Sequence, residues 1–319
     1  MESSEKPNNE LNETQDDQEK LLRKNKKKRK LKENLIGYAM ILPWLIGFCV
    51  FTVGAMGYSF YLSFTNYNVL SAPVWTGTSN YVRLFTNDPR FFNSIQRTFM
   101  FTFTSVPLRL TVALIVALIF KKKRPGSAFF TMLYYVPSIV GGSVAVAVIW
   151  RQLFSYSGVF NAFLGLFGIE ARAWLVQPST AIWFLVLLSL WQFGAPMIIF
   201  LAGLRQIPQE LYEAASIDGA SGLLQFRKIT LPLLSPVIFF NLVMALIGGF
   251  QVFASAFLIT NGGPLDTTNF YALYLFNNAF NYGRMGYAAA MGWVLLVIIV
   301  FFTSIVFASQ KRWVHYSGE

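Results

Sequence analysis

Very few residues of this 319-residue chain belong to types that carry out chemistry. It has one cysteine, Cys49, and one histidine, His315, so neither an intrachain disulfide nor a Cys/His metal cluster can form. It also lacks a Gly-x4-Gly-Lys-Ser/Thr loop, which commonly cradles nucleotide phosphates. The sequence therefore predicts a protein that is not an enzyme and binds no cofactor or metal of its own.

The residues best suited to bind a partner are concentrated in one charged segment, about 204–232, between two long uncharged runs. Its charged side chains are Arg205, Glu210, Glu213, Asp218, Arg227 and Lys228. Pro208 suits the first turn of a helix, and Gly219 suits the left-handed position where that helix would end. The pattern predicts two short helices joined by a sharp turn. We expect this hairpin to lie outside the bilayer and to bind another protein.

The elements that must position this hairpin are apolar helices. The chain is 55% hydrophobic and only 13% charged, with a mean hydropathy of +0.48, whereas soluble domains carry about 25% charged residues. Six segments have the roughly 20 apolar residues that a membrane span needs. They are 35–64, 98–120, 128–150, 179–203, 232–259 and 286–309. We therefore expect an all-α membrane protein with six transmembrane helices in residues 34–319.

The distribution of basic residues predicts the orientation. With the N-terminus in the cytoplasm, nineteen Lys and Arg fall on the cytoplasmic side and six on the other side. Cytoplasmic loops are enriched in Lys and Arg, so both termini and the charged hairpin should be cytoplasmic.

Residues 1–33 are expected to form a disordered basic tail. Ten Lys and Arg and eight Asp and Glu leave this tail almost neutral, but its basic residues crowd into 20–32. A nucleic-acid arm and a lipid anchor are both compatible with such a run. The apolar segment that follows at once favours the anchor, in contact with membrane lipid and with no nucleic acid.

Between the spans, the sequence predicts short surface elements. Residues 158–169 and 268–281 are too short to cross a bilayer and should form surface helices, and 66–97 should form a polar connection.

The spans contain no Asp or Glu, which disfavours a carrier driven by protons or sodium. They offer neutral amides and aromatic rings instead, which suit the hydroxyls and C–H faces of a sugar. The candidate solute-binding residues are Trp191, Gln192, Asn241, Phe250, Gln251 and Phe253. Arg109 is the one ionisable side chain in mid-span. It could bind an acidic sugar, but we favour pairing with backbone carbonyls or reaching toward the interface.

The hairpin sequence resembles a known family. Glu213-Ala214-Ala215, Gly219 and Ile229-Thr230-Leu231-Pro232 are similar to the Glu-Ala-Ala...Gly...Ile-x-Leu-Pro loop of bacterial ABC importer permeases. The resemblance implies the type I permease fold, in which this loop is a coupling helix that docks on a separate ATPase subunit. The coupling residues would be Glu210, Leu211, Tyr212, Glu213, Ala214, Ala215, Asp218 and Gly219.

Further residues resemble the maltose-type carbohydrate permeases of that family. They include the turn 258–264, with Gly262-Gly263-Pro264, and Met285-Gly286-Tyr287. In those proteins the sugar lies near mid-membrane, at positions that place Trp191 and Gln251 close to it. Phe250, Val252 and Phe253 stand where the maltose permease carries asparagines, so maltose itself is not implied.

The resemblance implies the permease subunit of an ATP-driven importer for a carbohydrate, an oligosaccharide above all, in a bacterial cytoplasmic membrane. The partners would be a second homologous permease, an ABC ATPase dimer that holds ATP and magnesium, and an extracytoplasmic sugar-binding protein. An ABC permease for a charged solute, such as glycerol phosphate, an amino acid or an anionic glycan, is the alternative. A gradient-driven carrier is a second, less favoured alternative.

Overall fold

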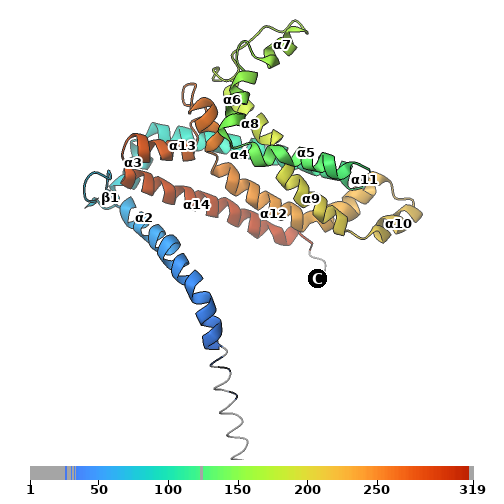
Figure 1. Cartoon of the computed structure of the whole chain (residues 1–319), viewed down its shortest axis with the longest axis horizontal. Coiled ribbons are helices and arrows are strands. Elements are labelled where there is room, and N and C mark those ends of the chain that lie inside the picture. Colours follow the sequence, from blue (N-terminus) through green and yellow to red (C-terminus); the bar gives the residue numbers. More distant parts are fainter. Residues whose placement is uncertain (1–25, 27–29, 31, 33, 123–124, 316–319) are drawn as a thin grey trace, which may run out of the picture. The chain divides into compact units, whose positions relative to one another are not determined.

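The computed structural model describes residues 26, 30, 32, 34–122 and 125–315 (Figure 1). Contacts within the chain divide it into two units, Met1–Tyr61 and Leu62–Glu319. The expected tail, residues 1–33, lies almost entirely outside the described residues.

The first unit contains most of one apolar helix, Asn34–Ser63. Its middle is a stretch of π-helix, η1 (Cys49–Gly54), which leads into α2 (Ala55–Ser63). Its side chains are apolar all round, and none in its most apolar window is buried. A helix with no polar face suits a lipid environment, in agreement with the predicted first span.

The second unit is organised on α4 (Pro89–Phe120), a helix of 32 residues. It begins nine residues earlier than predicted from hydropathy, because Asp88 and Pro89 form a strong helix start. The Asp88 carboxylate accepts a hydrogen bond from the Phe91 backbone N–H at 3.1 Å. Helices α8, α9, α12 and α13 all contact α4, which makes it the central helix of this unit.

The predicted third span is bent. Helices α5 (Ser127–Val140) and α6 (Val144–Leu153) meet at 98°, whereas hydropathy predicts one helix over 128–150. The bend falls at residues 141–143, where Ser143 is extended and its hydroxyl caps α6 by accepting from the Val146 N–H. Two consecutive glycines before a capping serine favour a helix end over continuation.

The other predicted spans are confirmed, with shifted ends. The fourth is divided into α8 (Ala181–Trp191) and α9 (Gly194–Gln206). The fifth is α12 (Leu231–Phe250), which ends before the predicted limit of 259, and the sixth is α14 (Met285–Ser309), followed by the 3-10 turn η5 (Gln310–Arg312). The described residues thus hold five helices able to cross a membrane, or six with the bent pair as one span.

Short elements connect these helices. Strands β1 (Thr65–Asn66) and β2 (Val74–Trp75) pair antiparallel, and α3 (Ser79–Thr86) follows. The two predicted short helices are present as α7 (Val159–Gly165), which is largely exposed, and as α13 (Tyr271–Phe276) with η4 (Asn277–Asn281). The surface position expected for the second is wrong, because α13 packs against α4 and α14 and buries Tyr271 and Leu273. The remaining elements are η3 (Ala256–Thr260), α10 (Gln209–Ile217), α11 (Gly222–Gln225) and η2 (Phe226–Thr230).

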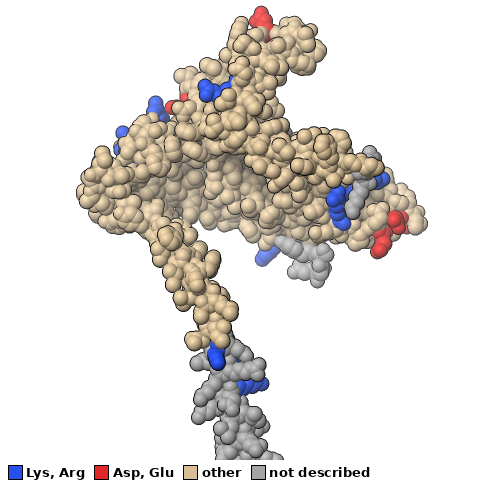
Figure 2. All heavy atoms as spheres, in the orientation of Figure 1, with Lys and Arg blue, Asp and Glu red and all other residues tan. Residues whose placement is uncertain are grey.

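Three apolar clusters hold the second unit together. One joins α6, α8 and η3 around Trp150 and Leu185, and another joins α4, α9 and α12 around Phe200 and Leu234. The third joins α3, α4, α13 and α14 around Tyr271. On the face seen in Figure 2, charged side chains of this unit gather near α10, α11 and the C-terminus, and again near α3, α6 and α7. The uncharged surface between them suits the interior of a bilayer.

Candidate functional site

The segment that carries the sequence motif folds into the expected helical hairpin. Helix α10 (Gln209–Ile217) starts after Pro208 and is stopped, two residues past its end, by Gly219, whose φ of +76° lies in the left-handed region. The Ala220 N–H donates to the Ala215 carbonyl at 2.8 Å, and the Gly219 N–H donates to Ser216 at 3.1 Å. This pair of bonds satisfies the last carbonyls of α10 and reverses the chain.

Side-chain bonds fix the second helix of the hairpin to the first. The Ser221 hydroxyl accepts from the Leu224 N–H at 3.4 Å at the start of α11. The Gln225 amide donates to the Ser216 hydroxyl at 3.0 Å and to the Ala220 carbonyl at 3.1 Å. The hairpin is therefore held together by its own hydrogen bonds.

Tyr212 connects this hairpin to the membrane helices. Its hydroxyl bonds with the Thr230 hydroxyl at 2.9 Å, and the Lys121 ammonium lies 3.5 Å from the centre of its ring. The ring packs beside Ile207 and Ile229 in the α4–α9–α12 cluster. Of the predicted coupling residues, Tyr212 is therefore the one that anchors the hairpin.

The other predicted coupling residues lie on the surface. Exposed are Glu210, Leu211, Glu213, Ala214, Asp218 and Gly219, and Ala215 is half-buried. Glu213 makes no ion pair with any described residue. Two leucine-sized neighbours that the sequence reasoning missed, Ile217 and Leu223, are 87% and 71% exposed. Their apolar type within a charged segment was the available signal. The hairpin thus presents acidic and apolar groups together, which is typical of a protein-docking surface.

Two of the predicted solute residues lie at the break between α8 and α9. Trp191 is 38% exposed and its ring centre lies 5.9 Å from that of Trp150. Gln192 ends α8, and its side chain lies directly over Gly141, so close that a β-carbon there would be 2.4 Å from its Cδ. Because Gly141 has no side chain, the bend between α5 and α6 can pack directly against the break between α8 and α9.

The Gln192 carbonyl is the acceptor that Arg109 binds. Arg109 Nε donates to it at 3.1 Å, and the Ser138 hydroxyl donates to it at 2.9 Å. The same Ser138 hydroxyl accepts from the Ala195 N–H at 2.9 Å. Pairing of Arg109 with a backbone carbonyl, the reading that the sequence favoured, is confirmed.

A cavity of about 140 Å³ lies between α4, α8 and α12 at this level. Its polar lining is Ser105, Arg109, Ser189, Gln192 and Ser255, and Val252 beside Gln251 also lines it. The cavity thus brings one predicted solute residue, Gln192, together with three serines that the sequence reasoning did not single out.

The other predicted solute residues are placed elsewhere. Phe250 is 1% exposed and packs against Phe99 and Phe302. Asn241 is buried, and its amide donates to the Val237 carbonyl in its own helix at 3.1 Å. These two side chains therefore offer no accessible surface to a solute in this conformation.

Gln251 and Phe253 follow the end of α12. Gln251 is exposed, and Phe253 is half-buried with its ring stacked on Phe257. They remain accessible to a solute.

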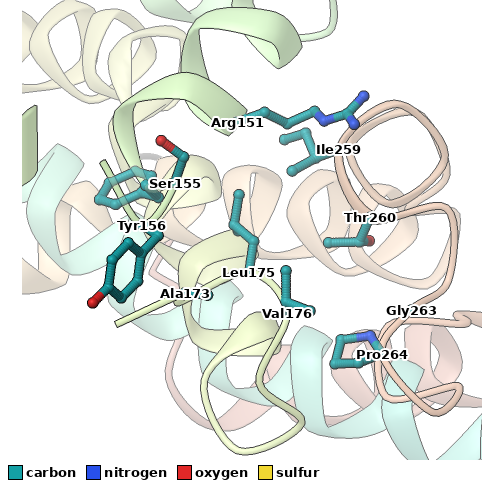
Figure 3. Close-up of a pocket in the computed structure, with 11 residues that line it drawn as sticks. Arg151, Ser155, Tyr156, Ala173, Leu175, Val176, Ile259, Thr260, Gly263 and Pro264 are labelled. Atoms are coloured by element: carbon teal, nitrogen blue, oxygen red, sulfur yellow. The ribbon is translucent and has the colours of Figure 1, made fainter. Parts of the chain in front are cut away.

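A larger cavity of about 500 Å³ (Figure 3) lies beside α6, at the end of the bundle away from α10 and α11 (Figure 1). Arg151, Ser155 and Tyr156 line it from α6 and the segment after it, and Thr260 and Pro264 line it from the other side. The Arg151 guanidinium has no ion pair or hydrogen bond with a described residue. Among the described residues, no group of three His, Cys, Asp or Glu side chains could hold a metal ion.

Comparison with known proteins gives the same picture. The family of binding-protein-dependent transport system inner membrane components matches residues 89–315. The chain is 50% identical to the probable ABC transporter permease protein YesP of Bacillus subtilis, over 92% of this chain and 96% of that protein. It is 34% identical to the trehalose/maltose transport system permease protein MalF of Thermococcus litoralis, over 86% and 94%.

A solved structure has the same fold. It is a chain of a bacterial alginate ABC transporter in complex with an alginate pentasaccharide-bound periplasmic protein. The TM-score is 0.78 at 24% sequence identity, and the match covers 89% of this chain and 96% of that one. Since the family match spans the central helices, the hairpin and the cavities, the chain belongs to the binding-protein-dependent transport system inner membrane components, the permeases of ABC importers.

Proposed function

We propose that this chain forms half of the translocation pathway of an ATP-driven importer for a carbohydrate, an oligosaccharide above all. The observation that carries the proposal is the exposed, internally bonded hairpin of α10 and α11, which holds the motif and ends a helical bundle without acidic groups in its spans. The carbohydrate class is supported by the similarity to a trehalose/maltose permease.

The hairpin would dock on a separate ABC ATPase dimer, which holds ATP and magnesium, and would be displaced when that dimer changes conformation. Leu211, Ala214 and Ile217 are exposed apolar groups that a cleft in that subunit could bury, with Glu213 at their edge. Tyr212 would then pass the motion to α4 through Lys121 and to α12 through Thr230. Because the hairpin is held by its own hydrogen bonds and anchored by the Tyr212 ring, a displacement of the hairpin would move these helices without unfolding it.

The remaining partners follow from this role. A second, homologous permease would complete the pathway, and an extracytoplasmic sugar-binding protein would deliver the solute. A chain of the same fold was solved with a periplasmic protein bound, which supports the second of these. The protein would lie in a bacterial cytoplasmic membrane with both termini and the hairpin in the cytoplasm, as the basic residues indicate.

The solute would pass the break between α8 and α9 and the end of α12. Trp191 and Phe253 provide ring faces there, and Gln192 and Gln251 provide amides. Rings and amides of this kind bind the C–H faces and hydroxyls of a sugar.

The substitution Glu213→Lys tests the docking role. We expect normal membrane insertion but a loss of ATP-dependent uptake of roughly tenfold or more, because a lysine would replace a carboxylate at a charge-complementary contact. Uptake and ATP hydrolysis are measured on the complete importer in proteoliposomes. In the variant, added solute should no longer raise the rate of ATP hydrolysis.

The matched control is Glu170→Lys, the same charge change at an exposed position just after α7, at the other end of the bundle. It should transport normally. Uptake that survives Glu213→Lys, or that persists without ATP, would contradict the proposed function.

A further inference from the structure

The polar cavity in mid-span carries an arginine whose charge the described residues leave unbalanced. Arg109 uses Nε for the Gln192 carbonyl, and its two terminal nitrogens have no hydrogen bond or ion pair with any described residue. The sequence has no Asp or Glu between Asp88 and Glu170 or between Glu170 and Glu210. Helices α4, α5, α8 and α9 therefore contain no carboxylate that could neutralise this guanidinium.

An unbalanced cation at this depth is costly. Ionisable residues in membrane spans commonly mark solute or ion pathways, and a buried charge is stable only when paired or hydrated. The Gln192 carbonyl satisfies one N–H of Arg109 but contributes no charge. The two remaining nitrogens form the planar fork that binds a carboxylate in bidentate fashion.

The groups around the guanidinium are also unpaired. The hydroxyls of Ser105, Ser189 and Ser255 line the same cavity and make no hydrogen bond with a described residue, although Ser105 is only 1% exposed. Buried hydroxyls are nearly always hydrogen-bonded, so the unpaired hydroxyl of Ser105, beside the half-buried Ser189 and Ser255, indicates a ligand or water in this cavity.

The arrangement follows from helix periodicity. Thr102, Ser105 and Arg109 are three and four residues apart on α4, so they lie on one face of the helix. Thr102 continues the polar stripe with a buried hydroxyl that also lacks a partner. A stripe of three hydrogen-bonding groups runs along the helix that forms the centre of the unit.

From this geometry we propose that Arg109 binds a carboxylate of the transported solute, and that Ser105, Ser189 and Ser255 bind hydroxyls beside it. The substrate class is then an acidic carbohydrate, one with a uronate-type sugar. This inference rests on the proposed function and specifies that the transported carbohydrate carries a negative charge. The larger cavity supports it, since Arg151 lines that cavity with no acidic partner among the described residues.

The test is uptake by the complete importer in proteoliposomes, with its binding protein, of a panel of neutral disaccharides and their uronate counterparts. The probes are digalacturonate, its dimethyl ester, and neutral disaccharides of galactose, glucose and mannose. The wild-type importer should take up the free acid in preference to its ester. The ester has the same ring and length but no charge, so it isolates the carboxylate.

Arg109→Gln should lower uptake of the acid by roughly ten- to a hundredfold, the range expected for a charge-assisted hydrogen bond, with little effect on neutral probes. Arg109→Lys keeps the charge but not the fork, so it should retain an intermediate rate. The control is Arg97→Gln on the same helix, where Arg97 bonds to Asn93 outside the cavity at 3.2 Å. The binding protein is the same in every arm, so a changed ratio of acid to neutral uptake belongs to this chain.

The other outcomes are distinct. Neutral probes transported without the acid, or an equal loss of both in Arg109→Gln, would overturn the carboxylate proposal and leave Arg109 as a brace for the Gln192 carbonyl. No saccharide transported by the wild-type importer would overturn the proposed carbohydrate function itself. If the Arg109 variants do not assemble, the ratio of acid to neutral uptake is measured for Ser189→Val and Ser255→Val, which line the same cavity. An unchanged ratio in both variants would contradict the proposal.

Discussion

At the scale of single residues, Asp88 holds together three elements that are far apart in the sequence. One carboxylate oxygen accepts from the Phe91 N–H at the start of α4, and the other accepts from the hydroxyls of Tyr274 at 2.7 Å and Tyr287. Burial and the hydrogen bond to Asp88 raise the pKa of Tyr274 to about 12. Tyr274 therefore stays a neutral donor throughout the physiological pH range, which keeps α13 bonded to α4.

Replacement of Asp88 by alanine should lower the free energy of unfolding by about 2 to 4 kcal/mol, since it removes a helix cap and leaves two tyrosine hydroxyls without an acceptor. Asp88→Asn should cost less, because the asparagine oxygen still caps the helix and its amide N–H groups can donate to the tyrosine hydroxyl oxygens. The stabilities of the two variants and the wild type are compared by thermal unfolding in detergent. Equal stability of Asp88→Ala and the wild type would show that this acceptor is dispensable.

At the scale of elements, the hairpin shows how one helix-ending glycine sets the geometry of the turn between α10 and α11. Gly219 was identified from its type and place alone, and the structure gives it a φ of +76° with both carbonyl-capping bonds formed. The bonds from Gln225 that hold α11 against α10 could not be predicted, since they depend on how the turn closes.

Gly219→Ala should strain this turn by about 1 to 2 kcal/mol, the cost of a left-handed conformation for a residue with a β-carbon. The hairpin would then dock poorly, and uptake per ATP hydrolysed should fall. Gly222→Ala is the control, because Gly222 opens α11 with ordinary helical geometry and has no atom within 4 Å of an added β-carbon. Matching ratios of uptake to hydrolysis in the two variants would argue against the turn geometry as the reason for a glycine.

At the scale of the whole molecule, the proposed topology places the two ends of the second unit on opposite sides of the membrane. Charged groups gather at both ends, and the surface between them is uncharged (Figure 2). The orientation itself depends on the basic residues of the loops.

Single-cysteine variants test this orientation in a Cys49→Ser background, since Cys49 is the chain's one cysteine. Tyr156, just after α6, and Lys311, in η5 near the C-terminus, are both exposed and lie at opposite ends of the second unit (Figure 1). A membrane-impermeant maleimide should label Tyr156→Cys in intact cells and Lys311→Cys only in inverted vesicles. The reverse pattern would place the hairpin outside and exclude contact with a cytoplasmic ATPase.

The sequence by itself determined the class of protein, the apolar spans and the helical hairpin that carries the motif, because these depend on signals local to the chain: apolar runs, a helix-ending glycine and a motif at fixed spacing. The tertiary structure decided what those signals cannot encode. It divides the fourth span at Gln192, bends the third by 98° and turns Tyr212 inward. It buries Phe250 and Asn241 while it gathers three serines around Arg109. Hydropathy treats all faces of a spanning helix alike, so only the packing of α4 against α8 and α12 reveals which side chains share a cavity.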